Sequence, residues 1–460
     1  YTVGFLNHIY SDIGFDVYPN RFAGGLFDPG EGGLQTACDE GEFKVTSHNT
    51  DGVQFVSGTV NPVTISEKTW RTCYQHIRAA NVFLANVDKS PMAASAVSQY
   101  KAEARFLRAW YYFILLRHYG GVPLLGDEVY DNENYETINM TRASFADCVD
   151  YIVSECKAAQ ADLRVRVSGS NFGRASGGAC LGLISRTLLY AASPLFNGTT
   201  HTDDPKLKEV MGYPEADQER WKAAVDAARS LIATGMWQVF VHHADKDGNP
   251  EPGWGFYAQF QGDDFQNLTS WNGTQYPFAA LDGCILSEIH AMGTEKESLF
   301  DPPSCNNDGK VGSGGYPTHD LVECFPMKDG AKPGEGKYPY DRMNPAQNRD
   351  PRLANTIIYN GMLHFTNTQN ITVYTYKGIG ATVDAINQAT STGYYWRKMT
   401  HRDTRGGFWV TVSQTFQVMR YEEILLNYAE AVNEYYGPNY SETIGDKELS
   451  PMAVLRLLRE

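Results

Sequence analysis

The stretch YKAEARFLRAWYYFILLRHYGGVPLL, residues 100–125, decides the fold of this chain. It is the most apolar and aromatic long helical segment in the sequence, and it stops at Gly-Gly-Val-Pro. One face of the expected helix carries four polar or basic side chains at helical spacing, namely Lys101, Arg105, Arg108 and Tyr112. The spacing alone predicts a core helix with one basic stripe.

Helical periodicity recurs on both sides of this stretch. Ser144 and Asp147 form a Ser-x-x-Asp cap, and Gly437 with Pro438 marks a helix end. The expected helices cover residues 66–88, 144–163, 174–192, 219–234 and 417–436, and a further helix starts at Ser450-Pro451 and runs out at Glu460. Paired helices of about 20 residues joined by short turns predict a mostly α scaffold of repeated helical pairs.

The character of the chain changes between Met236 and Ser413, where Gly, Pro, Asn, Asp and aromatics dominate. Long irregular segments inside a compact protein are usually functional. Short strands are plausible there, for example residues 370–377, where Ile371, Val373 and Thr375 face one side. We expect one unit over residues 1–460, incomplete at its C-terminus. Its predicted parts are a scaffold of residues 66–235 and 414–460, and an irregular ligand-binding lobe of residues 236–413.

The composition excludes several classes of protein. The formal net charge of −15 repels phosphate backbones, so nucleic acid is not an expected partner. No run approaches the roughly 18 apolar residues that span a bilayer. The eight cysteines include no Cys-x-x-Cys pair, so they are expected to be mostly buried thiols, and we expect no metal site and no cofactor.

Residues 253–278, GWGFYAQFQGDDFQNLTSWNGTQYPF, interleave eight aromatics with amides and carboxylates. Sugars need this mixture, because a flat ring covers their C–H face while planar polar groups bind their hydroxyls. The candidate ligand-binding residues are Trp254, Tyr257, Trp271, Asn272, Tyr276 and Asp264. An alternative stays open, in which these aromatics fill a minor hydrophobic cluster beneath a long loop. For a second aromatic group, Tyr394-Tyr395-Trp396 with Phe408-Trp409, structural packing is the better interpretation.

Catalytic interpretations are weaker. Residues 245–256 imitate the start of a calcium loop, but Pro250 and Phe256 stand where Gly and Glu are required. Glycoside hydrolysis needs only two acids about 5 to 10 Å apart. Asp263, Asp264 and Glu288 are the candidates for that alternative.

Several segments resemble the SusD/RagB family. KAEARFLRAWYYFILLRHYGGVPLL (101–125) is similar to the family's hallmark segment, WRTCYQHIRAANVFLANVD (70–88) to its preceding helix, and GRASGGACLGLISRTLLYAASPLF (173–196) to its small-residue helix. YPTHDLVECFPMKDG (316–330), NRDPRL (348–353) and MRYEEILLNYAEAVNE (419–434) follow in the family's order. The match is weakest in the loops near residues 14–60 and 240–310, which carry ligand specificity.

The resemblance implies an outer-membrane, cell-surface lipoprotein of Bacteroidetes that binds a glycan and delivers it to a SusC-like TonB-dependent transporter. It implies binding without chemistry, and a lipidated cysteine upstream of Tyr1 as the link to the membrane. It also implies that Glu288 is structural and that the helical pairs form a TPR-like, SusD-like superhelix carrying a large loop-rich lobe with short strands. Two other hypotheses stay open: a helical-repeat adaptor for peptides or proteins, and a glycoside hydrolase.

Overall fold

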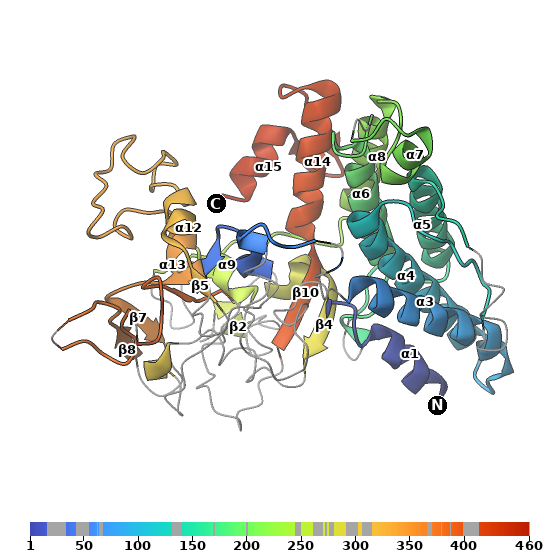
Figure 1. Ribbon diagram of the computed structural model, residues 1–460, viewed down its shortest axis with the longest axis horizontal. Helices are drawn as coiled ribbons and strands as arrows, with labels where there is room; N and C mark the ends of the chain where they lie inside the picture. Colours follow the sequence, from blue (N-terminus) through green and yellow to red (C-terminus); the bar gives the residue numbers. More distant parts are fainter. Residues whose placement is uncertain are drawn as a thin grey trace.

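The computed structural model describes residues 1–15, 34–42, 55–61, 63, 68–130, 140–168, 171–198, 201–243, 250–260, 270–271, 274–275, 280–290, 302–305, 315–365, 370–378, 380–386, 388–398 and 414–459. Long helices stack on one side of the molecule, and short helices and strands form a lobe on the other (Figure 1). Helices α14 (Tyr421–Tyr436) and α15 (Pro451–Leu457) lie between them. The described chain is mostly helical, as predicted.

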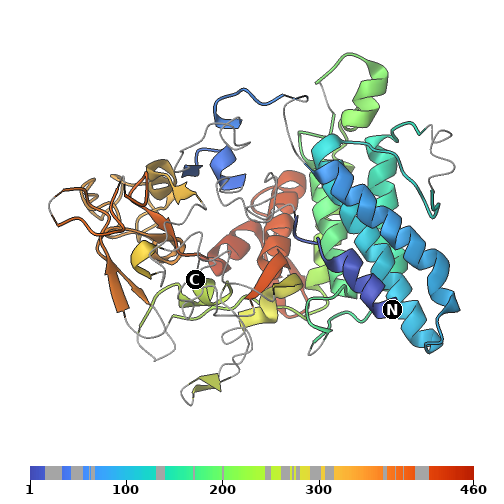
Figure 2. The same ribbon diagram turned by 60° about the horizontal axis from the view of Figure 1, so that its bottom comes forward.

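The scaffold is a series of helices in which each packs against the next (Figure 2). Contacts run from α3 to α4, α5, α6, α8, α14 and α15 in turn, while α1 packs on α3 and α4. The bounds are α1 Thr2–Tyr10, α3 Thr69–Asn86, α4 Ala94–Tyr119, α5 Phe145–Gln160, α6 Gly177–Ala192, α7 Pro205–Met211 and α8 Glu219–Ile232. The main hydrophobic core lies among these helices. The predicted helical-pair scaffold is confirmed.

Several helix ends follow the capping signals in the sequence. The Ser144 hydroxyl accepts a hydrogen bond from the Asp147 amide at 3.0 Å, and the Asp147 carboxylate accepts one from the Ser144 amide at 3.3 Å. The Ser450 hydroxyl caps α15 by accepting a hydrogen bond from the Ala453 amide at 3.1 Å, with Pro451 in the first turn. Gly120, at φ +72°, ends α4. These side chains and the glycine satisfy backbone groups that have no partner inside the helix.

The predicted helix over residues 417–436 is too long at its start. Residues Gln414–Arg420 form strand β10, which pairs antiparallel with β4 (Cys284–His290), and α14 begins only at Tyr421. Cross-strand hydrogen bonds to β4 override the helical periodicity of this stretch. Ile285, Leu286 and Met419 join the scaffold core, so this two-stranded sheet is docked on the helices.

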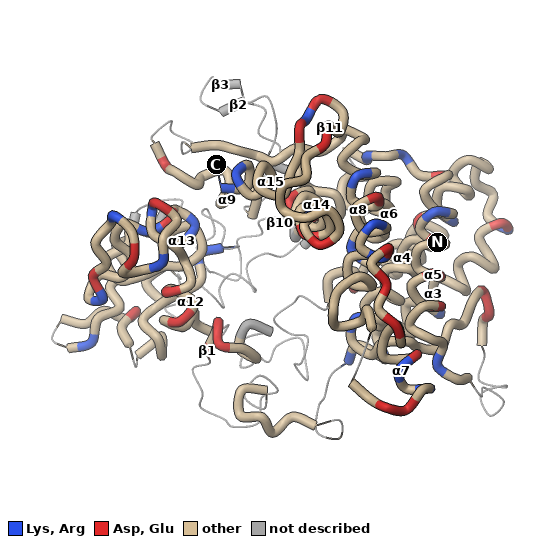
Figure 3. Tube along the Cα trace, turned by 90° about the horizontal axis from the view of Figure 1, so that it is seen from above, with Lys and Arg blue, Asp and Glu red and all other residues tan. Residues whose placement is uncertain are grey.

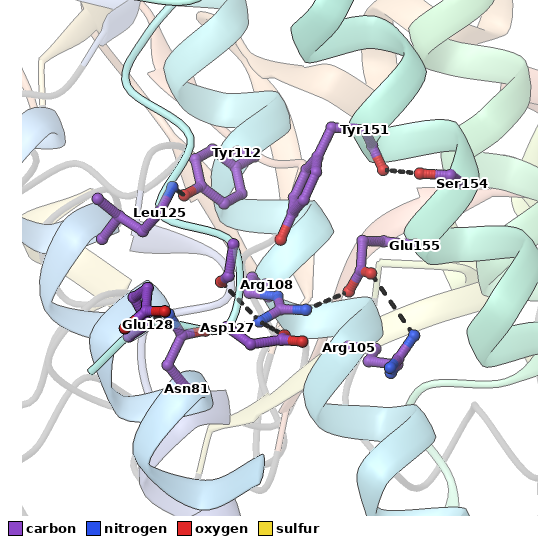
Figure 4. A network of polar contacts seen from close by, with 11 residues as sticks. Asn81, Arg105, Arg108, Tyr112, Leu125, Asp127, Glu128, Tyr151, Ser154 and Glu155 are labelled. Atoms are coloured by element: carbon purple, nitrogen blue, oxygen red, sulfur yellow. Dashed lines mark hydrogen bonds and ion pairs between the residues drawn. The ribbon is translucent and has the colours of Figure 1, made fainter. Parts of the chain in front are cut away.

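Arg108 is the centre of a buried polar network (Figure 4). Its side chain is 1% exposed and pairs with Glu155 of α5 and Asp127, both at 2.7 Å. It also donates to the Asn81 side chain of α3 at 2.6 Å and to the carbonyl of Gly126 at 3.0 Å. At Arg108, the predicted basic stripe therefore forms polar contacts between helices. It joins α3, α4 and α5 to the segment that leaves α4.

That exit segment, residues 120–130, is held along its length. The Gly121 amide donates to the Val210 carbonyl at 2.7 Å, and a Cβ on Gly121 would collide with the carbonyl of Ala143. Farther along, the Leu125 amide donates to the Tyr112 hydroxyl at 2.9 Å, and the Tyr74 hydroxyl donates to the Pro123 carbonyl at 2.7 Å. The Gly-Gly-Val-Pro signal therefore marks a compact turn with no room for side chains at its start.

The glycines of α6 allow close packing, but mainly against side chains rather than a neighbouring backbone. A Cβ on Gly178 would collide with the indole of Trp237, and one on Gly182 with the sulfur of Met419. Trp237 is 1% exposed, and its indole nitrogen donates to the Cys284 carbonyl at 3.0 Å. The indole is therefore fixed in place.

The lobe is built from short elements with small separate hydrophobic clusters. In the predicted strand at 370–377, Val373 and Thr375 are buried while Tyr374 and Tyr376 are exposed, so the predicted facing is confirmed, although the strand itself ends at Val373. Strand β1 (Gly41–Glu42) pairs with β5 (Tyr316–Pro317), which brings an N-terminal segment into the lobe. The other elements are α9 Trp254–Ala258, α12 His319–Cys324, α13 Pro351–Thr356, β2 Ser270–Trp271, β3 Thr274–Gln275, β6 Ile357–Ile358, β7 Met362–Phe365, β8 Asn370–Val373 and β9 Tyr395–Trp396.

Acidic and basic positions are interspersed over the helices and the lobe (Figure 3). All eight cysteines lie within the described residues; six are buried and no disulfide joins them, which confirms the expected buried thiols. In the part of the chain that the structure describes, no helix is both long enough and apolar enough to cross a membrane.

We predict that Arg108→Met lowers the free energy of unfolding by about 3 to 5 kcal/mol, because it removes the closer partner of the mostly buried Glu155, which keeps only Arg105 at 3.6 Å. Lys101→Met is the matched control, since Lys101 pairs with Asp88 at 2.6 Å on the surface. It should change stability by less than about 1 kcal/mol. Urea denaturation of both variants measures the difference. Equal effects would contradict the role assigned to Arg108.

A second pair of variants tests the packing of α6. Gly178→Ala should destabilise the protein by about 1 to 3 kcal/mol, because Trp237 cannot move away. Gly4→Ala in α1, where no atom lies within 4 Å of the added methyl group, should stabilise it by up to about 1 kcal/mol through helix propensity. Thermal unfolding would show opposite shifts, and a stabilising Gly178→Ala would refute the close contact.

Candidate functional site

The predicted sugar-contact stretch begins at α9, where the lobe meets the scaffold. Gly253 precedes the helix at φ +79°, and a Cβ there would lie 2.8 Å from the Asn355 side chain of α13. A Cβ on Gly255 would lie 2.7 Å from the backbone of Phe240 and His242. Two glycines thus let α9 pack directly against its neighbours.

Trp254 and Tyr257 lie in the interior of the lobe. Their exposed fractions are 4% and 2%, their ring centroids are 5.4 Å apart, and they pack with Phe240. The guanidinium of Arg397 lies 4.3 Å from the centroid of the Tyr257 ring. The burial of these two rings favours the alternative in which aromatics of this stretch fill a hydrophobic cluster. Their contact with a sugar stays a prediction.

The other four candidates are not placed by the structure. Asp264, Asn272 and Tyr276 lie outside the described residues, and Trp271 is described only as part of the backbone of β2, paired with Thr274 of β3. Their contact with a sugar therefore stays a prediction.

Arg397 ties the interior of the lobe together. Its side chain is 3% exposed and donates to the Ala354 carbonyl at 2.7 Å and to the Asn355 side chain at 3.1 Å. It also approaches Glu251 at 3.5 Å. The charge of Arg397 is thus matched by a carboxylate, two oxygens of α13 and the face of Tyr257.

The next residue, Lys398, belongs to a group that we call the ring–cation cluster: Phe256, Phe260, Lys398 and Arg420. The Lys398 ammonium lies 4.4 Å from the centroid of the Phe260 ring and 5.3 Å from that of Phe256. The Arg420 guanidinium lies 4.9 Å from the same Phe260 centroid. Two cations therefore share one aromatic ring.

Gln259 connects this cluster to the scaffold. Its side-chain oxygen accepts a hydrogen bond from Arg420 at 3.1 Å, and its carbonyl accepts one from the Gln417 side chain at 2.5 Å. Both partners belong to β10, which continues directly into α14. The scaffold thus fixes where the end of α9 lies.

Burial and mutual repulsion change the acid–base properties of this region. Burial and the nearby Arg420 charge lower the pKa of Lys398 to about 8, partly offset by Glu40. Burial raises the pKa of Glu422, which lies 3.7 Å from Arg420. Both pKa shifts favour the uncharged form of the side chain.

A cleft of about 580 Å³ opens beside the cluster, between α9, α13, α14 and α15. Its lining includes Phe256, Gln259 and Arg420 as well as the exposed aliphatic side chains of Leu426 and Met452. This volume lies in the range of small-molecule sites.

Glu288 lies elsewhere, on β4. It lines a separate cavity of about 350 Å³ with Tyr10 and Arg174, and it is the one carboxylate among the described residues that line it. A glycosidase needs two. The described residues also contain no group of three or more potential metal ligands.

The second aromatic group is packed where the structure describes it. Tyr395 is 1% exposed, and its hydroxyl donates to the Asp384 carbonyl at 2.8 Å. Tyr394 stacks on His319. Structural packing, the preferred interpretation, is confirmed for Tyr395, whereas Phe408 and Trp409 lie outside the described residues.

Two family models match the chain. One, described as the SusD family, matches residues 288–456, and the other, described as starch-binding associating with outer membrane, matches residues 34–189. Together they include the exit of α4, β10 and α14. The chain belongs to the SusD family.

Solved structures of SusD-like proteins share the fold. A SusD-like protein from Bacteroides fragilis has a TM-score of 0.68 at 20% identity, covering 95% of this chain and 75% of its own. A SusD-like carbohydrate-binding protein from the same species has a TM-score of 0.66 at 20% identity, with coverages of 100% and 82%. Surface glycan-binding protein A from Bacteroides fluxus has a TM-score of 0.59 at 16% identity, with coverages of 100% and 80%. A comparison with curated proteins gave no match.

Sequence reasoning missed Lys398 and Arg420. Arg420 fell inside the predicted helix, so its position at the end of a strand could not be anticipated. Lys398 follows the aromatic run Tyr394-Tyr395-Trp396 after one residue, and this proximity of a cation to rings was the available signal.

Lys398 predicts a specific dependence of stability on pH. Its folded pKa of about 8 lies below the ordinary value of 10.5, so the unfolded chain binds more protons between these limits and stability rises with pH there. We expect Lys398→Met to be more stable than the wild type at about pH 7, with a difference that shrinks toward about pH 9.5. Urea titrations across this range measure it. A difference in stability that does not change with pH would contradict the lowered pKa of Lys398.

Proposed function

We propose that this protein binds an oligosaccharide or polysaccharide at the cell surface and delivers it to a SusC-like TonB-dependent transporter, without chemistry. Matches to SusD-family models in both halves of the chain support this function. So does the likeness in fold to structures named as carbohydrate-binding and surface glycan-binding proteins. The lipid anchor at the outer membrane belongs to the same proposal, supported by the family description that mentions this membrane.

The observation that carries the site is the position of α9. Its buried rings, Trp254 and Tyr257, form a rigid base at the junction of lobe and scaffold, and the aromatic and amide-rich residues 261–278 follow directly in sequence. We propose that the base supports the stretch and that Trp271, Asn272, Tyr276 and Asp264 contact the sugar. An aromatic platform with planar polar groups suits a carbohydrate.

One observation favours a second candidate function, peptide binding. Leu426, Met452 and Leu455 are about half exposed and line the cleft beside α14 and α15. An apolar groove between helices is a common way to hold an amphipathic peptide. This candidate predicts affinity for peptides that does not depend on Trp271.

A glycan array comparing the wild type with Trp271→Ala tests the proposal. Loss of one stacking ring should weaken binding at least about fivefold, by analogy with about 1 to 3 kcal/mol for bases stacked on aromatics. Trp70→Ala is the matched control, because Trp70 is 41% exposed but lies on α3, distant from α9 (Figure 1). It should leave affinity unchanged.

Three results would count against this function. They are equal losses in Trp271→Ala and Trp70→Ala, turnover of a bound glycan, and binding of peptides but of no glycan. Turnover would favour the hydrolase alternative, in which Asp264→Asn or Glu288→Gln abolishes cleavage.

A further inference from the structure

The ring–cation cluster holds two positive charges that the described residues neutralise only in part. The Lys398 ammonium contacts two aromatic rings, but no carboxylate of the described residues lies within ion-pair distance of it. Its neighbour in sequence, Arg397, has Glu251 and two α13 oxygens as partners. Glu40 offsets the charge of Lys398 only in part and forms no ion pair with it, so among the described residues Lys398 is the less compensated of two adjacent cations.

Arg420 is only partly neutralised. Its hydrogen bond to Gln259 is to an uncharged oxygen, and its contact with Glu422 is long, at 3.7 Å. Burial also raises the pKa of Glu422, which favours its neutral form. Glu422, the carboxylate that the described residues place beside Arg420, is therefore a weak source of negative charge.

The two cations oppose each other. Arg420 lowers the pKa of Lys398, which is the expected result of like charges held around one ring in a desolvated place. The negative face of an aromatic ring offsets part of this repulsion. An anion that reached these side chains would offset more of it, because opposite charges attract each other more strongly in a partly desolvated place than in bulk water.

In the sequence, the cluster adjoins two segments that the structure does not describe, one of which contains proposed sugar-contact residues. Phe260 immediately precedes residues 261–269, and Lys398 immediately precedes residues 399–413, which include Phe408 and Trp409. Lys398 and the Arg420 side chain are partly exposed. This positive site stands out in a chain with a net charge of −15.

We infer that the glycan bound by this protein carries an anionic group, a carboxylate or a sulfate ester, and that Lys398 and Arg420 hold this group. The inference rests on the proposed function and narrows its ligand class. Phe260 orients the two cations, and Gln259 fixes Arg420.

A glycan array with neutral, uronate-containing and sulfated members, probed with the full chain, tests the inference. The strongest binders should be acidic. Chemical carboxyl reduction or desulfation of the best binder should weaken binding at least tenfold, and which treatment does so distinguishes carboxylate from sulfate. Lys398→Met should lose at least tenfold toward the acidic glycan but less than twofold toward its neutralised form.

Two further measurements separate charge recognition from packing. Lys398→Arg keeps the positive charge and should restore most of the affinity that Lys398→Met loses. The lysine ammonium resonance of Lys398, followed by NMR, should show a raised pKa when the acidic glycan binds and no change with the neutralised form.

The outcomes are distinguishable. Preference for neutral glycans, or equal binding by Lys398→Met, would overturn the inference and leave the proposed function intact. Binding to no glycan in the array would overturn both.

Discussion

The buried guanidinium of Arg108 is the constraint on which the scaffold depends. A charge that is 1% exposed must be paired, and its partners come from α3, from α5 and from the exit of α4. Each partner is needed at one position, so the charge fixes the relative placement of three helices and of the chain that follows. The Gly-Gly-Val-Pro turn exists because this exit has to run closely along the helices.

The scaffold in turn determines where the candidate site lies. Each helix packs on the next as far as α14, and β10 feeds α14 directly. Arg420, the last residue of β10, therefore belongs both to the scaffold and to the ring–cation cluster. Through Gln259 it holds the end of α9 in position. The site that we propose would therefore be supported by rigid elements of the scaffold.

Much of the fold follows from the sequence because its signals are local. Ser144 with Asp147, Ser450 with Pro451, and Gly120 all act within one turn, and the helices start or end where these residues predict. Strand β10 could not be predicted, since its pairing with β4 is a long-range interaction and its residues extend the periodicity of α14. The same limit applies to the site. Aromatic content singled out the stretch 253–278, but it could not show that this stretch begins with helix α9, that Trp254 and Tyr257 are buried or that Lys398 and Arg420 meet at Phe260.

The central proposal is that residues of the stretch 253–278 hold a glycan. A crystal structure of the protein with the best glycan from the array tests it most directly. The account predicts a sugar ring in van der Waals contact with the Trp271 side chain and an acidic substituent beside Lys398. A glycan bound against the scaffold helices, remote from α9, would contradict it.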